Sequence, residues 1–386
     1  MVRIAGIYSP PDFPHGHRQA LQLDVYPEFN VDANRGRSEP HPIHAFYLEI
    51  TTDEGVCGRF GPIDAYQIDP ILRSLRPLLL GRDPLATEVL FDLMVKLDRH
   101  GRSGYFMTAV SAVDCALWDL KGQAWDQPVY RLLGGPTRAS VPAYASMLGF
   151  SIEALAAAEI AGEYKAMGYA AQKWFFRYGP GSGAEGLEKN VAMAAAVREA
   201  VGPNYRIMFD AFMAWDMPYA REMLTRLAPL NPTWMEEPLP PERVGSFVEL
   251  KRSSKVPLAT GEHVYTRWQS KELLVSGAVD FLQNDPDWTG GISELTKVCA
   301  LASSFDVPVV AHGHSLLPAL HVAGAQPHTT VPYVEYLIRH QAHKQTFHAQ
   351  PIAPVNGVVE LPTSPGLGFE LDESKIQSRE TITLSY

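Results

Sequence analysis

Three short stretches in the middle of the chain decide the fold: RIMFD at residues 206–210, TWMEE at 233–237 and LATGE at 258–262. Each ends in an acidic residue, and a longer amphipathic stretch separates it from the next one. Short apolar runs that alternate with helical patterns are typical of βα units, whose strands are parallel. The middle of the chain is therefore predicted to form a parallel sheet of the α/β class.

The same rhythm continues from about residue 140 to residue 340. Eight such units predict a parallel (β/α)8 barrel of the TIM type. A doubly wound sheet has fewer strands and usually a glycine-rich first turn, which is not found after a strand here. The glycine-rich run 179–186 lacks the Lys-Ser/Thr ending of a phosphate loop and is interpreted as a βα loop. The predicted strands are Val141–Ser146, Ala170–Phe176, Arg206–Asp210, Thr233–Glu237, Leu258–Glu262, Val279–Asn284, Val307–His312 and Tyr333–Leu337.

The two ends of the chain differ from this barrel. Residues 1–135 combine strand-like and helical patterns and end at Gly134-Gly135-Pro136, so we expect a separate unit there and a barrel over 136–350. Residues 351–386 are rich in proline and glycine. We expect this tail to pack back onto the first unit rather than extend the barrel.

Composition excludes several classes of protein. The 43 acidic residues outnumber 33 Lys and Arg, and a net charge of −10 disfavours broad nucleic-acid binding. We find no apolar run of about 18 residues and no secretory signal pattern, so no membrane association is expected. Three widely spaced cysteines argue against a disulfide framework and fit a reducing cytoplasm.

Acidic residues and a histidine end consecutive predicted strands. They recur roughly every 23 to 27 residues, about one βα unit, so their side chains should converge on one rim of the barrel. Neighbouring carboxylates repel one another, and a divalent cation removes the conflict; oxygen ligands favour Mg²⁺ over Zn²⁺. We predict Asp210, Glu236 and Glu262 as ligands. The pleat decides between Glu236 and Glu237, and the spacing favours Glu236.

Asp285 and His312 end adjacent predicted strands. A carboxylate that accepts a hydrogen bond from the imidazole fixes its tautomer and raises its pKa, which makes a general base. A buried structural histidine is the alternative. His314 would share a face with His312, and we interpret it as a loop or substrate contact rather than a second base.

These segments resemble the enolase superfamily in its mandelate racemase-like branch. The resemblance covers nearly the whole chain and implies a modified (β/α)8 TIM-type barrel with an α+β capping domain formed by the N-terminal region and the C-terminal tail. It also implies a homo-oligomer with one Mg²⁺ per subunit, which removes the proton α to a carboxylate through a stabilised enediolate. The matching segments are Phe209-Asp-Ala-Phe, Trp234-Met-Glu-Glu-Pro, Gly261-Glu-His, Asn284-Asp-Pro-Asp-Trp-Thr-Gly-Gly, Val309-Val-Ala-His-Gly-His and the helix Ser111–Gly122.

The second strand departs from the pattern of the family racemases, which carry Lys-x-Lys there. Lys173 matches the first lysine, which typically contacts the substrate carboxylate, but Phe175 stands at the second position and cannot move a proton. The resemblance therefore disfavours a two-base racemase. His312 alone would take the α proton and return it to the departing β-hydroxyl, which yields a 2-keto-3-deoxy acid.

The closer resemblance is to the rhamnonate dehydratase-like acid-sugar dehydratases. It rests on Gly261-Glu262-His263, on the segment 285–288 and on the run 236–241; Pro238 and the pair His263-Val264 differ in detail, which leaves the sugar open. It implies a catalytic part for His263 and Glu335. Glu335 would donate a hydrogen bond to a substrate carboxylate and so needs a raised pKa, unless it forms a structural ion pair. The implied substrate contacts are Arg37, His15, His314, Trp288 and Arg177; a solvated loop is the alternative for the first two.

We therefore expect a Mg²⁺-dependent dehydratase of a hexonate, 6-deoxyhexonate or pentonate. An epimerase, racemase or cycloisomerase that uses Lys173 or Arg177 as a second base is the alternative enzyme. A binding protein that keeps the fold without turnover is the alternative outside enzymes.

Overall fold

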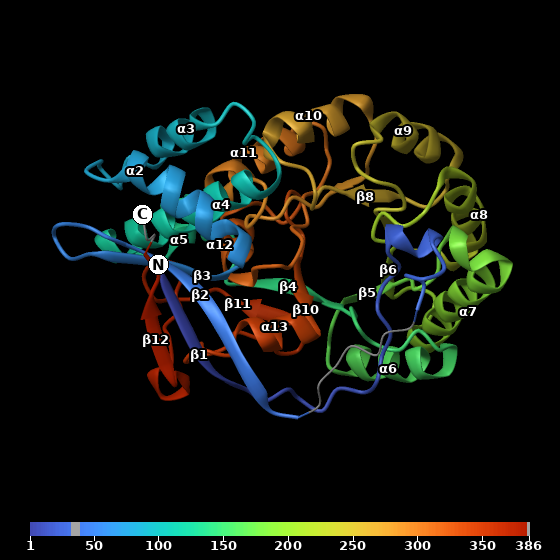
Figure 1. Cartoon of the computed structure of the whole chain (residues 1–386). Coiled ribbons are helices and arrows are strands. Elements are labelled where there is room, and N and C mark those ends of the chain that lie inside the picture. Colours follow the sequence, from blue (N-terminus) through green and yellow to red (C-terminus); the bar gives the residue numbers. More distant parts are fainter. Residues whose placement is uncertain (32–38, 384–386) are drawn as a thin grey trace.

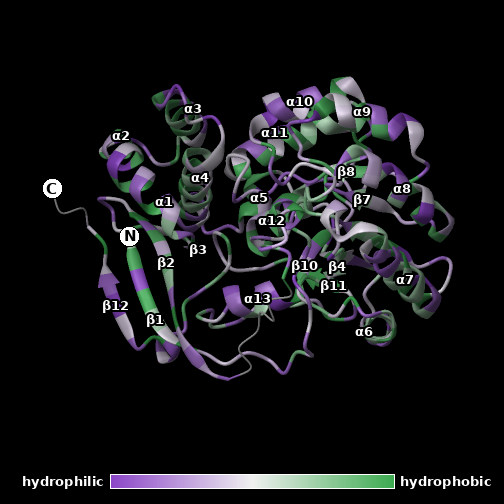
Figure 2. Cartoon of the chain, turned by 45° about the vertical axis from the view of Figure 1, so that its right-hand side comes forward, coloured by the Kyte–Doolittle hydropathy of each residue, from purple (hydrophilic) through white to green (hydrophobic). Residues whose placement is uncertain are grey.

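The computed structural model describes residues 1–31 and 39–383, which form a cap and a barrel that lie side by side (Figure 1). The cap contains an antiparallel sheet of four strands in the order β12–β1–β2–β3. Val2 at the start of β1 lies opposite Tyr47 of β2 on one side and Thr381 of β12 on the other. Figure 2 shows hydrophobic and hydrophilic residues alternating along β1, as expected for a strand with one buried face. The bounds are β1 (Val2–Tyr8), β2 (His41–Thr51), β3 (Cys57–Ile63) and β12 (Ser378–Thr381).

Helices cover one face of the cap sheet. The long helix α4 (Gly104–Trp125) is apolar nearly all round, so it is buried; it packs on β3 in the cap and on helix α11 of the barrel. This double contact makes α4 the main link between the two parts. The other cap helices are α1 (Ala65–Pro70), η2 (Ile71–Leu75), α2 (Arg76–Leu79), α3 (Thr87–Leu97) and α5 (Val129–Leu132), with the turn η1 (Gln22–Val25) in the N-terminal segment.

The barrel is a curved parallel sheet in the order β10–β4–β5–β6–β7–β8–β9. Its strands are β4 (Ser140–Ser146), β5 (Ala171–Phe175), β6 (Arg206–Asp210), β7 (Trp234–Glu236), β8 (Leu258–Thr260), β9 (Phe281–Leu282) and β10 (Val334–Leu337). Each helix between two strands packs on the outside, as in βα units (Figure 1). The helical segments are α6 (Ala154–Ala166), η3 (Pro180–Ser182), α7 (Gly183–Val201), α8 (Met217–Leu227), η4 (Ala228–Leu230), α9 (Val244–Ser253), α10 (Thr266–Ser276), α11 (Gly291–Ser303), α12 (Leu316–Ala325) and α13 (Ile338–Lys344).

The predicted strand Val307–His312 holds its expected place but does not form a full strand. It makes one bridge, between Leu282 and Val309, with a hydrogen bond of 2.8 Å from the N–H of Val310 to the carbonyl of Leu282. Pro308 has no N–H to donate, which shortens the ladder at this point. The expectation of eight complete strands was therefore wrong in this unit, although the modified barrel is confirmed.

The C-terminal tail contributes to both sheets. Strand β12 joins the cap sheet, as expected, but β11 (Val358–Glu360) pairs antiparallel with β4 of the barrel. The expectation that the tail does not extend the barrel sheet was therefore wrong for β11. The tail also contains the turn η5 (Glu373–Lys375). The division at residues 135 and 350 stays a prediction.

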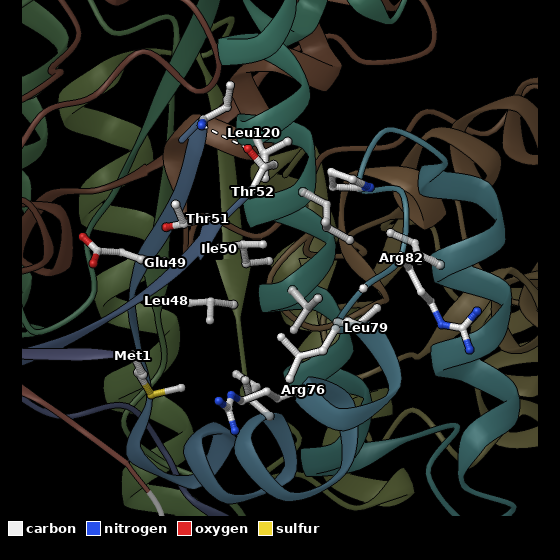
Figure 3. A pocket seen from close by; sticks show the side chains of 18 of the residues that line it. Met1, Leu48, Glu49, Ile50, Thr51, Thr52, Arg76, Leu79, Arg82 and Leu120 are labelled. Carbon is white, nitrogen blue, oxygen red and sulfur yellow. Dashed lines mark hydrogen bonds between the residues drawn. The ribbon is translucent and has the colours of Figure 1, made fainter. Parts of the chain in front are cut away.

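A partly open cavity of about 910 Å³ lies between the cap sheet and its helices (Figure 3). Leu48, Ile50, Leu79 and Leu120 line it, and Arg76 lies at its edge. None of the predicted site residues that the structure describes lines this cavity. Among the residues that the structure describes, no helix is long and apolar enough to cross a membrane.

Candidate active site

Lys173 lies at the centre of a buried group of carboxylates at the strand ends. Its Nζ atom is 3.3 Å from Oδ2 of Asp210 and 3.0 Å from Oε1 of Glu335, and it also bonds Oε1 of Glu236. Asp210 and Glu236 are direct partners in the parallel pairing of β6 with β7, which places both side chains on the same face. All four side chains are buried, so one ammonium offsets several carboxylates in a site shielded from water.

Burial and charge shift the pKa values of this group. Burial alone lowers the pKa of Lys173, but the charges of Glu236 and Glu335 outweigh it and hold the pKa well above its usual value. Burial, reinforced by the charge of Glu236, raises the pKa of Asp210 well above its usual value. Burial likewise acts to raise the pKa of Glu335, yet the charge of Lys173 wins and lowers it. The prediction of a raised Glu335 pKa was therefore wrong, because the lysine lies directly against it.

The neighbours Glu236 and Glu237 point to different partners. Oε2 of Glu236 accepts hydrogen bonds from Nε1 of Trp234 at 3.0 Å and from Nε2 of Gln283 at 2.5 Å. Glu237 follows the strand with a φ of 37°, a left-handed conformation, and its carboxylate has other partners. It accepts a hydrogen bond from Oγ1 of Thr260 at 2.9 Å and lies 2.9 Å from Nδ1 of His263.

The carboxylate of Glu262 contacts two histidines. It lies 3.4 Å from Nδ1 of His263 and 3.5 Å from Nε2 of His312. Among the described residues, Glu237, Glu262 and His263 form a group whose ligand atoms all lie within 4.8 Å of one another. Burial, opposed by the charge of His312, raises the pKa of Glu262 to about 7. The structure thus joins Asp210 to Glu236 through Lys173, and Glu262 to the two histidines.

His312 and Asp285 form a hydrogen-bonded pair, as their strand-end positions suggested. Nδ1 of His312 is 2.9 Å from Oδ2 of Asp285, and the backbone N–H groups of Asp287 and His314 fix that carboxylate at 2.6 Å and 3.1 Å. Burial lowers the pKa of His312, but the charge of Glu262 and the bond to Asp285 raise it to about 10.

A second pair lies next to the first. Nδ1 of His314 is 2.7 Å from Oδ2 of Asp287, and Nζ of Lys344 is 2.9 Å from the same oxygen. Burial acts to raise the pKa of Asp287, but the charge of Lys344 and the bond to His314 hold it well below its usual value. The ring of Trp288 stacks on His312 at 4.8 Å and on His263 at 5.7 Å between ring centres. The aromatic side chain thus positions histidines from two strand ends.

Two protein-domain families match the chain. Residues 42–134 match the N-terminal domain of the mandelate racemase/muconate lactonizing enzymes, and residues 156–375 match the enolase C-terminal domain-like family. The second match alone covers more than half of the chain. The chain belongs to the mandelate racemase/muconate lactonizing enzyme family of the enolase superfamily.

Individual members of the enolase superfamily are similar over nearly their whole length. An L-rhamnonate dehydratase from Saccharopolyspora erythraea is 33% identical over 366 residues, which cover 92% of this chain and 89% of that protein. An arabinonate dehydratase from Saccharolobus solfataricus is 34% identical, covering 88% and 91%. The crystal structure of rhamnonate dehydratase from Gibberella zeae complexed with Mg superposes with a TM-score of 0.80 at 29% identity, covering 97% and 95%.

Three residues predicted to contact substrate, Arg177, His15 and Arg37, differ in their surroundings. Arg177 is 1% exposed, and its Nη1 atom lies 3.2 Å from Oδ2 of Asp24, which is also bonded by Arg18. Asp24 belongs to the N-terminal segment, so this contact holds that segment on the barrel rim. His15 is exposed on the same segment. Arg37 lies outside the described residues.

Two features of the site were not predicted from the sequence. Lys344 comes from α13, after the last strand, and nothing in its spacing connects it to Asp287. The cap bonds the same loop from the other side: the N–H of Gly290 donates to Oγ of Ser111, and the N–H of Ser293 donates to Oδ2 of Asp114. The Ser111–Gly122 segment was noted as a family motif, but its hydrogen bonds to the loop could not be read from it.

Proposed function

We propose that this chain is a Mg²⁺-dependent acid-sugar dehydratase, a hydro-lyase that converts a hexonate, 6-deoxyhexonate or pentonate to a 2-keto-3-deoxy acid. The observation that carries the proposal is the placement of acid–base groups around the strand ends. His312, oriented by Asp285, is an imidazole base, whereas Phe175 ends β5 where a two-base racemase needs a second base. One base suits an elimination, in which a proton and a hydroxyl leave neighbouring carbons.

The strand-end carboxylates fit Mg²⁺. Asp210, Glu236 and Glu262 offer only oxygen atoms, and their burial together is costly while they stay charged, as the raised pKa values of Asp210 and Glu262 indicate. We infer that these three residues hold the ion. The carboxylate of Glu237 bonds Thr260 and His263, and we infer that it orients His263.

The remaining residues take separate parts in the reaction. When bound, Mg²⁺ supplies positive charge that stabilises negative charge on the substrate carboxylate. Lys173 binds the same carboxylate from the β5 side, and Glu335 holds Lys173 in place through the contact of 3.0 Å. His312 takes the α proton at Nε2. The negative charge of Glu262 is the largest influence that raises the pKa of His312. A cation held by Glu262 would offset that charge and so favour the neutral imidazole, the form of His312 that acts as a base.

The substrate-contact set comes from both parts of the chain. Trp288 and His263 form a stacked wall beside His312, and His314 lies next to it. We retain Arg37 and His15 in the N-terminal segment as candidates for the distal end of the sugar. Arg177 is better explained as the residue that anchors this segment through Asp24. The proposal also includes a cytoplasmic location and a homo-oligomeric state.

A panel of acid sugars tests the function. The purified chain with Mg²⁺ is incubated with L-rhamnonate, arabinonate and related hexonates and pentonates, and 2-keto-3-deoxy products are assayed. Turnover of at least one acid is expected. No turnover across a broad panel would refute the proposal, and exchange of the α proton without loss of water would favour an epimerase or cycloisomerase. Ligand binding that is independent of Mg²⁺ and lacks turnover would indicate a non-catalytic protein.

A further inference from the structure

The cavity of about 910 Å³ in the cap lies apart from the candidate active site, and no described residue of that site lines it. Protein interiors are close-packed, and voids larger than a water molecule are few. Pockets that bind small molecules typically measure about 300–1,000 Å³ and are lined mainly by hydrophobic side chains. The size of the cap cavity therefore suits a ligand better than it suits a defect in packing.

Aliphatic side chains from the cap sheet and the cap helices form the walls of this cavity. Leu48 and Ile50 alternate along β2, so both lie on the face of the sheet that meets the helices. Leu117 and Leu120 are one turn apart on α4 and lie on one face of that helix. Figure 3 shows Ile50 from β2 and Leu79 from α2 pointing into the space between them. The interior thus offers hydrocarbon contacts on both sides.

Such walls do not suit the acid sugar of the proposed reaction. A sugar acid carries hydroxyl groups along its chain, and a hydroxyl group that leaves water without a new hydrogen-bond partner loses free energy. An aliphatic chain has no hydrogen bonds to lose and gains free energy when it leaves water. We therefore expect an occupant with an aliphatic body, which is a different chemical class from the substrate.

Arg76 at the edge of the cavity indicates the head group of this occupant. Its side chain is exposed and forms no ion pair within the described part of the chain, whereas Glu49 on the adjoining strand is already paired with Arg59 at 2.8 Å. Arg76 and Thr52 lie at opposite ends of the cavity (Figure 3), and the acidic pair 53–54 follows Thr52. A guanidinium binds a carboxylate through two parallel hydrogen bonds. An anionic head group is thus favoured at the Arg76 end and disfavoured at the other.

We propose that the cap cavity is a second ligand site, which binds an aliphatic carboxylate with its chain between β2 and α4 and its head group at Arg76. The cavity is already formed without a ligand. Its α4 wall is fixed to the barrel by the hydrogen bonds of Ser111 and Asp114, so binding requires little ordering of the protein. This inference does not depend on the proposed dehydratase function.

A series of fatty acids tests the aliphatic part of the site. Isothermal titration calorimetry with the full chain measures the binding of hexanoate, octanoate and decanoate, with a chelator present so that no metal ion binds the carboxylates. Affinity is expected to rise by about fourfold for each added methylene group that leaves water. An affinity that does not change with chain length, or the absence of decanoate binding by wild type, would overturn the proposal.

The substitution Arg76→Gln tests the head-group contact. Octanoate and the uncharged 1-octanol are compared, since both carry the same length of chain. The affinity of Arg76→Gln for octanoate is expected to fall by about three- to fivefold, the range for an exposed ion pair, while its affinity for 1-octanol stays within about twofold of wild type. Arg252→Gln, at an exposed arginine on α9, is the matched control and should change neither. Equal octanoate affinities of wild type and Arg76→Gln would show that the carboxylate lies elsewhere.

Two substitutions that fill the cavity test where the chain binds. Ile50→Trp and Leu79→Trp place a larger side chain in the space from opposite sides, and each is expected to lower decanoate affinity by about tenfold or more. Leu155→Trp, at a position on α6 that is 88% exposed, is the matched control and should bind as wild type does. The melting temperature of each variant checks folding, and the second variant keeps the test decisive if the first does not fold.

Three further results would overturn the proposal by assigning the cavity to something else. Decanoate binding that both tryptophan variants retain would place the chain outside the cavity. Binding that appears only after removal of residues 384–386 would assign the cavity to that segment of the chain. Loss of the oligomeric state in both tryptophan variants, measured by analytical ultracentrifugation, would assign the cavity to a second copy of the chain.

Discussion

The buried carboxylate of Asp114 accepts a hydrogen bond of 2.9 Å from the backbone N–H of Ser293 and so joins the long cap helix to the barrel. Burial raises the pKa of Asp114 to about 7 from its usual 3.8. The folded state therefore holds a proton that the unfolded state releases. The resulting stabilisation is fully present below pH 3.8 and is lost as the pH rises through 7.

The substitution Asp114→Asn tests this linkage, because an amide resembles a protonated carboxyl group and does not titrate. Between pH 5 and pH 8, the free energy of unfolding of wild type should fall relative to the variant, by on the order of 3 kcal/mol. Chemical denaturation at both pH values measures the difference. If the free energy of unfolding changed equally with pH in wild type and variant, Asp114 would not be protonated in the folded state.

Lys173→Met removes the ammonium that three buried carboxylates share. We expect a loss of about 3–5 kcal/mol in the free energy of unfolding in the presence of a chelator, because buried charges are left uncompensated. Mg²⁺ should restore more stability to the variant than to wild type. Lys189→Met is the matched control, since Lys189 forms an exposed ion pair with Glu185 on α7, and should leave the denaturation midpoint unchanged. Equal stability of wild type and Lys173→Met in chelator would contradict the shared-cation arrangement.

His312→Asn is expected to abolish turnover while Mg²⁺ binding stays nearly intact. The asparagine can still bond Asp285 but cannot accept a proton, so kcat should fall by about 1000-fold or more. Isothermal titration calorimetry with Mg²⁺ should give a Kd within about threefold of wild type. A variant that retained most of its activity would show that another group is the base.

Glu236→Gln and Glu237→Gln distinguish the proposed ligand from its neighbour. Loss of a charged ligand should raise the Kd for Mg²⁺ by more than about 100-fold in Glu236→Gln and lower turnover with it. Glu237→Gln disturbs the orientation of His263 and should raise the Kd by about 10-fold. Titration of both variants with Mg²⁺ measures which substitution raises the Kd more. The reverse order would assign the ion to the group of Glu237, Glu262 and His263.

The spacing of the βα units predicted much of this architecture. Strands of a parallel barrel end at one rim, so the acidic residue that ends each run had to approach its neighbours, as Asp210 and Glu236 do. The pairing of Asp285 with His312 follows from the same rule. These relationships depend only on periodicity, which a single sequence contains.

Other features depend on geometry that periodicity does not encode. The pleat separates the side chains of Glu236 and Glu237, but the left-handed φ of Glu237 is local backbone geometry that a strand pattern does not encode. The pKa of Glu335 depends on how closely Lys173 approaches it across the barrel. Lys344 reaches Asp287 because α13 packs across the rim, and helix orientation is a result of tertiary packing.

The pairing of β1 with β12 also orders events during synthesis. Thr381 cannot meet Val2 until the ribosome has made the whole barrel between them, so one edge of the cap sheet stays open until then. Because contacts of such large sequence separation form slowly, the cap closes late, after the barrel strands have had time to pair. The edge of β1 thus stays exposed to other chains until the segment that forms β12 has been synthesised.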